Sequence, residues 1–154
     1  MELRCPGGEE LRALYAAAFP DEDLTGLVAA LAADPAVRHV CDGALEAHAA
    51  LTPCRVGDAP VWLLGPVAVA PERQGRGRGR VLVTAALAAV RPDPVCVLGD
   101  PGFYGRFGFT REDAVAPPYA LPEEWAPAWQ AIRTGALSGK LRVPAVWRDS
   151  ALWR

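Results

Sequence analysis

The N-terminal third of the chain shows two helical patterns of apolar residues. Over residues 9–19 the apolar side chains recur at helical spacing on one face, and Pro20 ends the pattern. Asp21 or Asp23 can cap a second helix with the same apolar face, which ends before Asp34-Pro35. Both segments are therefore predicted to be amphipathic helices that pack on a sheet.

Extended segments surround and follow these helices. Strands are predicted over residues 2–5, 37–41, 44–54 and 61–70. A two-residue turn at Asp42-Gly43 and a turn at Gly57-Asp58 separate the last three. The pattern predicts an antiparallel meander.

Two polar residues interrupt the small, apolar strand predicted over 44–54. Alternation places Glu46 and His48 on one face, two residues apart. Polar neighbours on such a strand belong either to a solvated face or to the lining of a cleft. We expect the solvated face and keep the cleft as the alternative.

The next strand, 61–70, contains Gly65-Pro66. Proline has no N–H to donate to a strand ladder, so the strand is expected to bulge or to lose a neighbour there. An edge strand that tolerates the proline is the other interpretation.

A glycine-arginine loop and a long Ala/Leu/Val run follow this strand. Gly75, Gly77 and Gly79 let backbone N–H groups turn toward one point, and the helix predicted over 79–90 begins there. An anion is the natural occupant of such a loop. The spacing fits neither the P-loop nor the dinucleotide pattern. The short strand predicted over 95–98 completes a right-handed βαβ unit.

The remainder of the chain has weaker signals. Asp100-Pro101 supplies an N-cap and a first helical residue for a short helix that contains Tyr104, and Gly108 closes it. A strand over 128–133 and a second strand over 141–143 are predicted to form a hairpin. Four tryptophans are expected to serve the core or a subunit contact, which leaves a homodimer open: Trp125, Trp129, Trp147 and Trp153.

Length and charge refine this picture. The 154 residues indicate a single domain over 1–154, and the formal net charge of −2 gives no general attraction to nucleic acid or membrane. Against that background Arg73, Arg76, Arg78 and Arg80 form a local positive cluster that suits a small polyanion. A compositional bias toward arginine is an alternative origin of these residues, but it does not explain the glycine spacing.

The cysteines, at positions 5, 41, 54 and 96, show no metal-ligand spacing. A disulfide between Cys41 and Cys54 is not expected, because the predicted turn places Cys41 opposite Ala44. The first residues lack a signal-peptide pattern, and no apolar run is long enough to span a bilayer. We expect a cytoplasmic protein with reduced thiols and without a metal.

Three motifs occur together over residues 61–109: the strand LGPVAV, the loop pattern Q-x-x-G-x-G at Gln74, Gly77 and Gly79, and the sequence GDPGFYGRFGF. In this combination the segment resembles the GNAT superfamily of N-acetyltransferases. The resemblance implies an α/β fold of the GNAT type, with a mixed central sheet, antiparallel N-terminal strands, a βαβ cofactor unit and flanking helices.

The resemblance also implies an activity, which is the transfer of an acetyl group from acetyl-CoA to an amine on a small molecule or peptide. Tyr104 matches the tyrosine that protonates the departing thiolate in many members. The residues that match the cofactor-binding positions are Val67, Ala68, Val69, Gln74, Gly75, Arg76, Gly77, Arg78, Gly79 and Arg80.

One departure from the family pattern concerns the general base. Many members carry a glutamate on the fourth strand, whereas residues 61–70 contain no carboxylate. Glu46 or His48 acting through water, or an acceptor amine of low intrinsic pKa, are the options that remain. The same departure favours an alternative function, a catalytically weak acyl-CoA-binding sensor or regulatory module.

Overall fold

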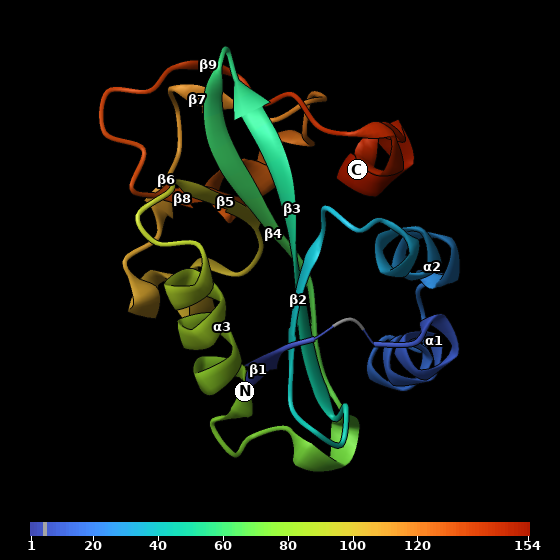
Figure 1. The fold of residues 1–154 in the computed structure, drawn as a ribbon. Coiled ribbons are helices and arrows are strands. Elements are labelled where there is room, and N and C mark those ends of the chain that lie inside the picture. Colours follow the sequence, from blue (N-terminus) through green and yellow to red (C-terminus); the bar gives the residue numbers. More distant parts are fainter. Residues whose placement is uncertain (5) are drawn as a thin grey trace. The chain divides into compact units, whose positions relative to one another are not determined.

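The computed structural model describes residues 1–4 and 6–154 (Figure 1). The helices are α1 (Gly8–Ala18), α2 (Thr25–Ala33), α3 (Arg78–Ala89) and α4 (Pro101–Tyr104). The strands are β1 (Glu2–Leu3), β2 (Arg38–Cys41), β3 (Ala47–Val56), β4 (Ala59–Val69), β5 (Val95–Leu98), β6 (Thr110–Arg111), β7 (Val115–Ala116), β8 (Trp129–Ile132) and β9 (Gly139–Lys140). Short 3₁₀ turns are η1 (Pro71–Arg73), η2 (Gly105–Phe107), η3 (Glu123–Ala128), η4 (Ala145–Trp147) and η5 (Ser150–Trp153).

The strands form a seven-stranded sheet in the order β1-β2-β3-β4-β5-β8-β6 and a separate pair, β7-β9. β1, β2 and β3 pair antiparallel, as do β5, β8 and β6. β4 and β5 pair parallel, with α3 between them in sequence. The α/β class and the βαβ unit predicted from the sequence are therefore confirmed.

The chain divides into two compact units, and β3 and β4 run through both. Unit 1 comprises Met1–Thr52 and Gly65–Ala89, whereas unit 2 comprises Pro53–Leu64 and Val90–Arg154.

Helices cover both faces of the strands in unit 1. Figure 1 shows α1 and α2 on one side of these strands and α3 on the other. The predicted apolar stripe of α1 is buried through Leu11, Leu14 and Tyr15, which pack against Cys41 and Ala68. Both N-terminal helices lie where the hydrophobic spacing predicts them. The carboxylate of Asp23 accepts the backbone N–H of Thr25 at 3.1 Å, at the start of α2.

The connection between β2 and β3 is longer than predicted. Cys41 lies opposite His48, and the loop between them closes through a hydrogen bond from Asp42 N–H to the Ala47 carbonyl. Leu45 takes a positive φ of 53° inside this loop. The prediction of a two-residue Asp42-Gly43 turn is wrong, because this loop spreads the reversal over several residues and shifts the register.

The β4 strand continues through Gly65-Pro66 to Val69. Gly65 has a φ of 142°, which a glycine adopts without steric cost. The strand therefore continues past its proline, but its pairing with β5 ends at Leu64, so the predicted loss of a neighbour is confirmed at this point. The interpretation as an edge strand is wrong, because β4 lies between β3 and β5 in the sheet.

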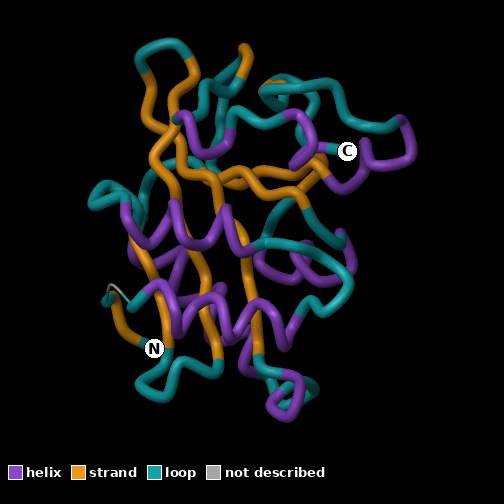
Figure 2. Tube along the Cα trace, turned by 90° about the vertical axis from the view of Figure 1, so that its right-hand side faces the viewer, coloured by secondary structure: helices purple, strands orange, loops and turns teal. Residues whose placement is uncertain are grey.

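Unit 2 contains short strands joined by long segments, and Figure 2 shows that the chain leading to the C-terminus is mostly loop with short helical turns. The predicted hairpin of 128–133 with 141–143 is wrong. β8 pairs with β5 and β6, whereas β9 pairs parallel with β7. The core prediction holds for Trp129, Trp147 and Trp153, whose rings pack edge to face.

Candidate active site

The segment between β4 and α3 brings backbone N–H groups to the start of a helix. Gly75 and Gly77 have φ values of 76° and 75°, a region that side chains disfavour. No atom lies within 4 Å of a Cβ built on either glycine, so both face open space. The side-chain amide of Gln74 donates to the Val69 carbonyl at 3.0 Å and ties the loop to the end of β4. This arrangement can hold an anion against the N-terminus of α3.

The strand residues assigned to the cofactor precede this loop. Val67 and Val69 are half-buried on β4, whereas Ala68 between them is buried in the core with α1. The alternation follows from the pleat of a strand, which turns successive side chains to opposite faces.

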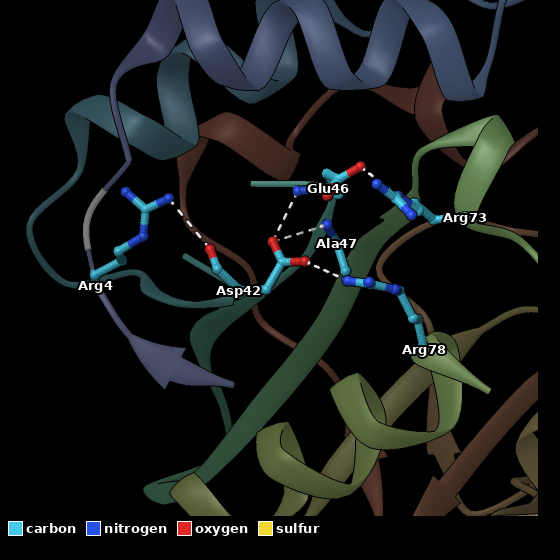
Figure 3. Close-up of polar contacts among 6 residues, drawn as sticks. All are labelled: Arg4, Asp42, Glu46, Ala47, Arg73 and Arg78. Atoms are coloured by element: carbon cyan, nitrogen blue, oxygen red, sulfur yellow. Dashed lines mark hydrogen bonds and ion pairs between the residues drawn. The ribbon is translucent and has the colours of Figure 1, made fainter. Parts of the chain in front are cut away.

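Two of the loop arginines are already neutralised by carboxylates, as Figure 3 shows. Arg73 pairs with Glu46 at 2.7 Å, and Arg78 pairs with Asp42 at 2.9 Å. Arg76 and Arg80 are exposed and form no ion pair within residues 1–4 and 6–154. The positive charge available to an incoming anion is therefore concentrated on Arg76 and Arg80, which the sequence could not distinguish from their neighbours.

Asp42 organises the loop that faces α3. Its Oδ1 accepts the backbone N–H groups of Glu46 and Ala47 at 2.7 and 3.3 Å, while its Oδ2 accepts the Arg78 guanidinium. Its carbonyl accepts Nη2 of Arg4 at 3.3 Å. One carboxylate thus fixes the β2-β3 loop and joins it to the first turn of the helix.

Glu46 is held in an ion pair with Arg73. The Arg73 guanidinium donates to its Oε2, and this hydrogen bond raises the pKa of Arg73. The Oε2 oxygen of Glu46 is therefore occupied by this guanidinium. The pairing argues against Glu46 as the general base.

His48 belongs to a buried chain of hydrogen bonds, so the expectation of a solvated face is wrong for this residue. Its Nδ1 lies 2.9 Å from the Tyr15 hydroxyl, and its Nε2 lies 2.9 Å from His39 Nδ1. His39 Nε2 lies 3.2 Å from the Leu31 carbonyl, and the Tyr15 hydroxyl also donates to the Pro66 carbonyl at 2.9 Å.

Burial keeps both imidazoles neutral. Desolvation, aided by the nearby His39 and Arg4, lowers the pKa of His48 to about 3. Desolvation also lowers the pKa of His39. Because the Leu31 carbonyl can only accept, His39 carries its proton on Nε2, and His48 then donates from its own Nε2. The Nδ1 of His48 is left as an acceptor, so it competes with the Pro66 carbonyl for the single proton of the Tyr15 hydroxyl.

Tyr104 lies in unit 2 at the end of α4. Asp100 caps this helix as predicted, and its side chain accepts the Gly102 N–H at 2.9 Å. The ring packs edge to face against Phe103 and Phe109. A Cβ built on Gly99 would lie 2.3 Å from Cε2 of Tyr104, so the absence of a side chain at position 99 gives the ring its place.

Burial raises the pKa of Tyr104 to about 12. The phenol is therefore protonated across the physiological pH range, which a proton or hydrogen-bond donor requires. Within residues 1–4 and 6–154 its hydroxyl has no hydrogen-bond partner. The group can donate to a ligand without first breaking a bond inside the protein.

Sequence reasoning missed Tyr15, His39 and Asp42. Tyr15 lies within the apolar pattern of residues 9–19, and Asp42 lies within the predicted turn, so neither position indicates a polar role. His39 lies opposite Ala50, so it is the diagonal neighbour of His48 on one face. The predicted two-residue turn would place His39 opposite Glu46, which also makes it a diagonal neighbour of His48. Strand alternation was therefore a signal that could have found this pair.

The thiols and acidic groups form no further centre in the described part of the chain. Cys41, Cys54 and Cys96 are buried thiols that form no disulfide among the described residues, and Cys5 lies outside those residues. Desolvation raises the pKa of Cys54 and of Cys96 to about 12, which makes both thiols unreactive. Leaving position 5 aside, no group of three His, Cys, Asp or Glu side chains could hold a metal ion, and no helix is long and apolar enough to cross a membrane.

Comparison with solved structures supports the fold. The GNAT family N-acetyltransferase YhbS of Escherichia coli, crystallised in complex with CoA, superposes with a TM-score of 0.79 at 21% identity, over 96% of this chain and 92% of that one. A GNAT family acetyltransferase of Brucella melitensis, crystallised in complex with acetyl-CoA, gives 0.70 at 28% identity, over 95% and 97%. Among curated proteins, none matches the sequence.

The sequence also matches a family model. Residues 8–109, which span both N-terminal helices, the meander, the glycine-arginine loop and Tyr104, match the model of the acetyltransferase (GNAT) family. The motifs that suggested this family from the sequence lie inside the matched region. The chain therefore belongs to the GNAT acetyltransferase family.

Proposed function

We propose that this protein, as a single catalytic domain, transfers the acetyl group of acetyl-CoA directly to an amine. The observation that carries the proposal is the loop at Gly75 and Gly77, which leads into the start of α3. Both glycines have positive φ angles and face open space. The complex of the Brucella melitensis relative with acetyl-CoA supports the same cofactor here. The acceptor is a small-molecule or peptide amine, and a homodimer is compatible with the proposal.

The loop would hold the pyrophosphate of the cofactor. Backbone N–H groups of Gln74–Arg80 and the helix N-terminus stabilise its negative charge. Arg76 and Arg80 supply the cations, because Arg73 and Arg78 are committed to carboxylates. Main-chain groups of Val67, Ala68 and Val69 are proposed to pair with the pantetheine arm.

The chemistry requires a neutral amine and a proton for the thiolate. The amine nitrogen attacks the thioester carbonyl carbon, the C–S bond breaks, the nitrogen releases one proton to solvent, and the thiolate leaves. Tyr104 is proposed as the donor to this sulfur. Deprotonation of an alkylamine of pKa ~10.4 at neutral pH costs about 4–5 kcal/mol, and a general base normally offsets that cost.

Neither base suggested by the sequence is well placed to offset this cost. Glu46 is paired with Arg73, and His48 is buried behind Tyr15. We therefore expect an acceptor whose amine is already neutral at the working pH. For an alkylamine the rate should rise about tenfold per pH unit up to the pKa of the amine.

Two variants test the assignment of the cofactor loop. Arg76→Gln removes an available cation and should weaken binding of acetyl-CoA in calorimetry by roughly tenfold. Arg78→Gln is the matched control, since it removes the same charge from a guanidinium that is already paired. Equal losses in the two variants would contradict the assignment.

A thiol-release assay over a panel of amines tests the function itself. The panel contains polyamines, amino acids, aminoglycosides, arylamines and peptide N-termini. The proposal predicts acceptor-dependent release of coenzyme A, strongest for amines of low pKa. The alternative, an acyl-CoA sensor, is favoured by the absence of a carboxylate on β4, and it predicts binding of acetyl-CoA without turnover on any amine.

A further inference from the structure

Two arginines in unit 2 are held directly opposite each other. Arg55, near the end of β3, exchanges both backbone hydrogen bonds with Arg142, at 3.1 and 2.7 Å, in an antiparallel bridge. Residues paired in this way lie about 5.5 Å apart at Cα and project their side chains to the same face. Like charges in this position repel each other, so the pair costs stability unless an anion lies between the guanidinium groups.

Two more cations gather around this pair. A hollow of about 270 Å³ is lined by Arg55, Arg142 and Arg148, and a second of about 310 Å³ by Lys140, Arg142 and Arg148. The hollows share Arg142, Val143 and Arg148, so they adjoin. We call the surface formed by Arg55, Lys140, Arg142 and Arg148 the cationic groove.

No acidic side chain lines either hollow. In the part of the chain that the structure describes, position 5 excepted, none of the four cations forms an ion pair. The nearest acid in sequence, Asp149, instead caps η5 by accepting the Ala151 N–H at 3.0 Å. The positive charge of the groove is therefore uncompensated.

Backbone carbonyls hold two of the guanidinium groups in place. Arg148 donates from Nε to the Val143 carbonyl at 2.9 Å, and Arg55 donates from Nη1 to the Asp58 carbonyl at 3.0 Å. Each guanidinium has five N–H donors, so further donors remain for a ligand. Ordering these side chains in advance reduces the entropy lost when a ligand binds.

We infer that the cationic groove binds a small molecule that carries several negative charges on phosphate or carboxylate oxygens. Guanidinium groups match the planar oxygen pairs of these anions and bind them with two parallel hydrogen bonds. The hollows have the size of a small-molecule site, and the protein's net charge of −2 provides no broad basic surface for a nucleic acid.

The site can be observed directly through its own side chains. Tripolyphosphate is titrated into ¹⁵N-labelled protein saturated with coenzyme A, and the Nε–H signals of the arginines are followed. Signals of Arg55, Arg142 and Arg148 should shift and saturate together. A second titration with citrate shows whether the groove prefers phosphate or carboxylate oxygens. Because each signal reports on its own side chain, a failure of coenzyme A binding would not alter this result.

Matched variants separate the groove from general charge effects. Arg142→Gln should weaken tripolyphosphate binding by about tenfold or more. Arg12→Gln changes the net charge equally on the exposed face of α1 and should leave the affinity unchanged. Equal affinities in wild type, Arg142→Gln and Arg12→Gln, or shifts that never saturate, would overturn the proposal.

Thermal unfolding provides a second test. Arg142→Gln should change the melting temperature relative to wild type differently without and with the anion. Without anion, Arg142→Gln should melt at or above the wild-type temperature, because the like-charge repulsion is gone. With saturating tripolyphosphate, the wild type should gain several degrees and Arg142→Gln much less. An Arg142→Gln protein that melts lower without anion, yet gains as much as wild type with it, would show a structural role for the arginine and no anion site.

Discussion

Burial sets the protonation state of the titratable residues in and around the candidate active site. Desolvation holds His48 neutral by lowering its pKa to about 3, and it holds Tyr104 neutral by raising its pKa to about 12. The same physical cause acts in opposite directions because the charged form is a cation in one case and an anion in the other. His48 is thereby a poor base, whereas Tyr104 stays protonated and is a weaker acid than a free phenol.

The buried His48 predicts a loss of stability in acid. Its folded pKa lies below the unfolded value near ~6.5, so the unfolded chain binds more protons between about pH 6.5 and about pH 3. The free energy of unfolding should fall as the pH drops through this window, by about 1.4 kcal/mol per pH unit for this residue. Denaturant unfolding near neutrality and at about pH 5 measures the slope. His48→Gln should flatten it, and an unchanged slope would show that His48 is not the titrating group.

The contact between Gly99 and Tyr104 predicts the outcome of two alanine substitutions. Gly99→Ala places a Cβ against the tyrosine ring and should destabilise the protein by about 1–3 kcal/mol. Gly105→Ala is the control, because this residue has helical angles of −56° and −28° and nothing lies within 4 Å of its Cβ position. It should be neutral or slightly stabilising. Similar losses at the two positions in thermal unfolding would rule out the ring contact as the cause.

Element by element, local signals in the sequence predicted most of the fold. Both N-terminal helices, the parallel pairing of β4 and β5 and the Asp100 cap follow from hydrophobic spacing and capping residues. The β2-β3 loop and the C-terminal strands were mispredicted. The side chain of Asp42 accepts hydrogen bonds from backbone N–H groups of the β2-β3 loop. The strand β9 pairs with β7, which is distant in sequence. Neither the hydrogen bonds of Asp42 nor the pairing of β9 can be recognised from a local sequence pattern.

The hydrogen bonds and the ion pair of Asp42 predict that different substitutions of this residue lower the free energy of unfolding by different amounts. Asp42→Ala removes the acceptor of two backbone N–H groups and the partner of Arg78, and should cost about 2 kcal/mol in the free energy of unfolding. Asp42→Asn keeps an oxygen for the loop and loses only the ion pair, so it should cost less than about 1 kcal/mol. Asp58→Ala, in the exposed β3-β4 turn, serves as a control. Equal losses for alanine and asparagine would assign the effect to the ion pair instead.

Over the whole molecule, the family and the fold were predictable while the site was only partly so. The motifs in residues 61–109 identified a GNAT acetyltransferase, and the family match and the α/β sheet confirm it. The sequence could not show which arginines are neutralised, because Arg73 and Arg78 meet their carboxylates only after β3 folds beside the loop. For the same reason it could not reveal the contact of Tyr15 with the pair of His48 and His39.

The most direct test of acetyl transfer compares the wild type with Tyr104→Phe in one experiment. Release of coenzyme A from acetyl-CoA is measured with the amine panel, and acetyl-CoA affinity is measured by calorimetry on the same samples. We predict acceptor-dependent release by the wild type, a fall in turnover of roughly 10²-fold or more in Tyr104→Phe, and equal affinities. Equal turnover in the two proteins would remove Tyr104 from the mechanism. Binding of acetyl-CoA by both proteins without release for any amine would contradict the proposed activity.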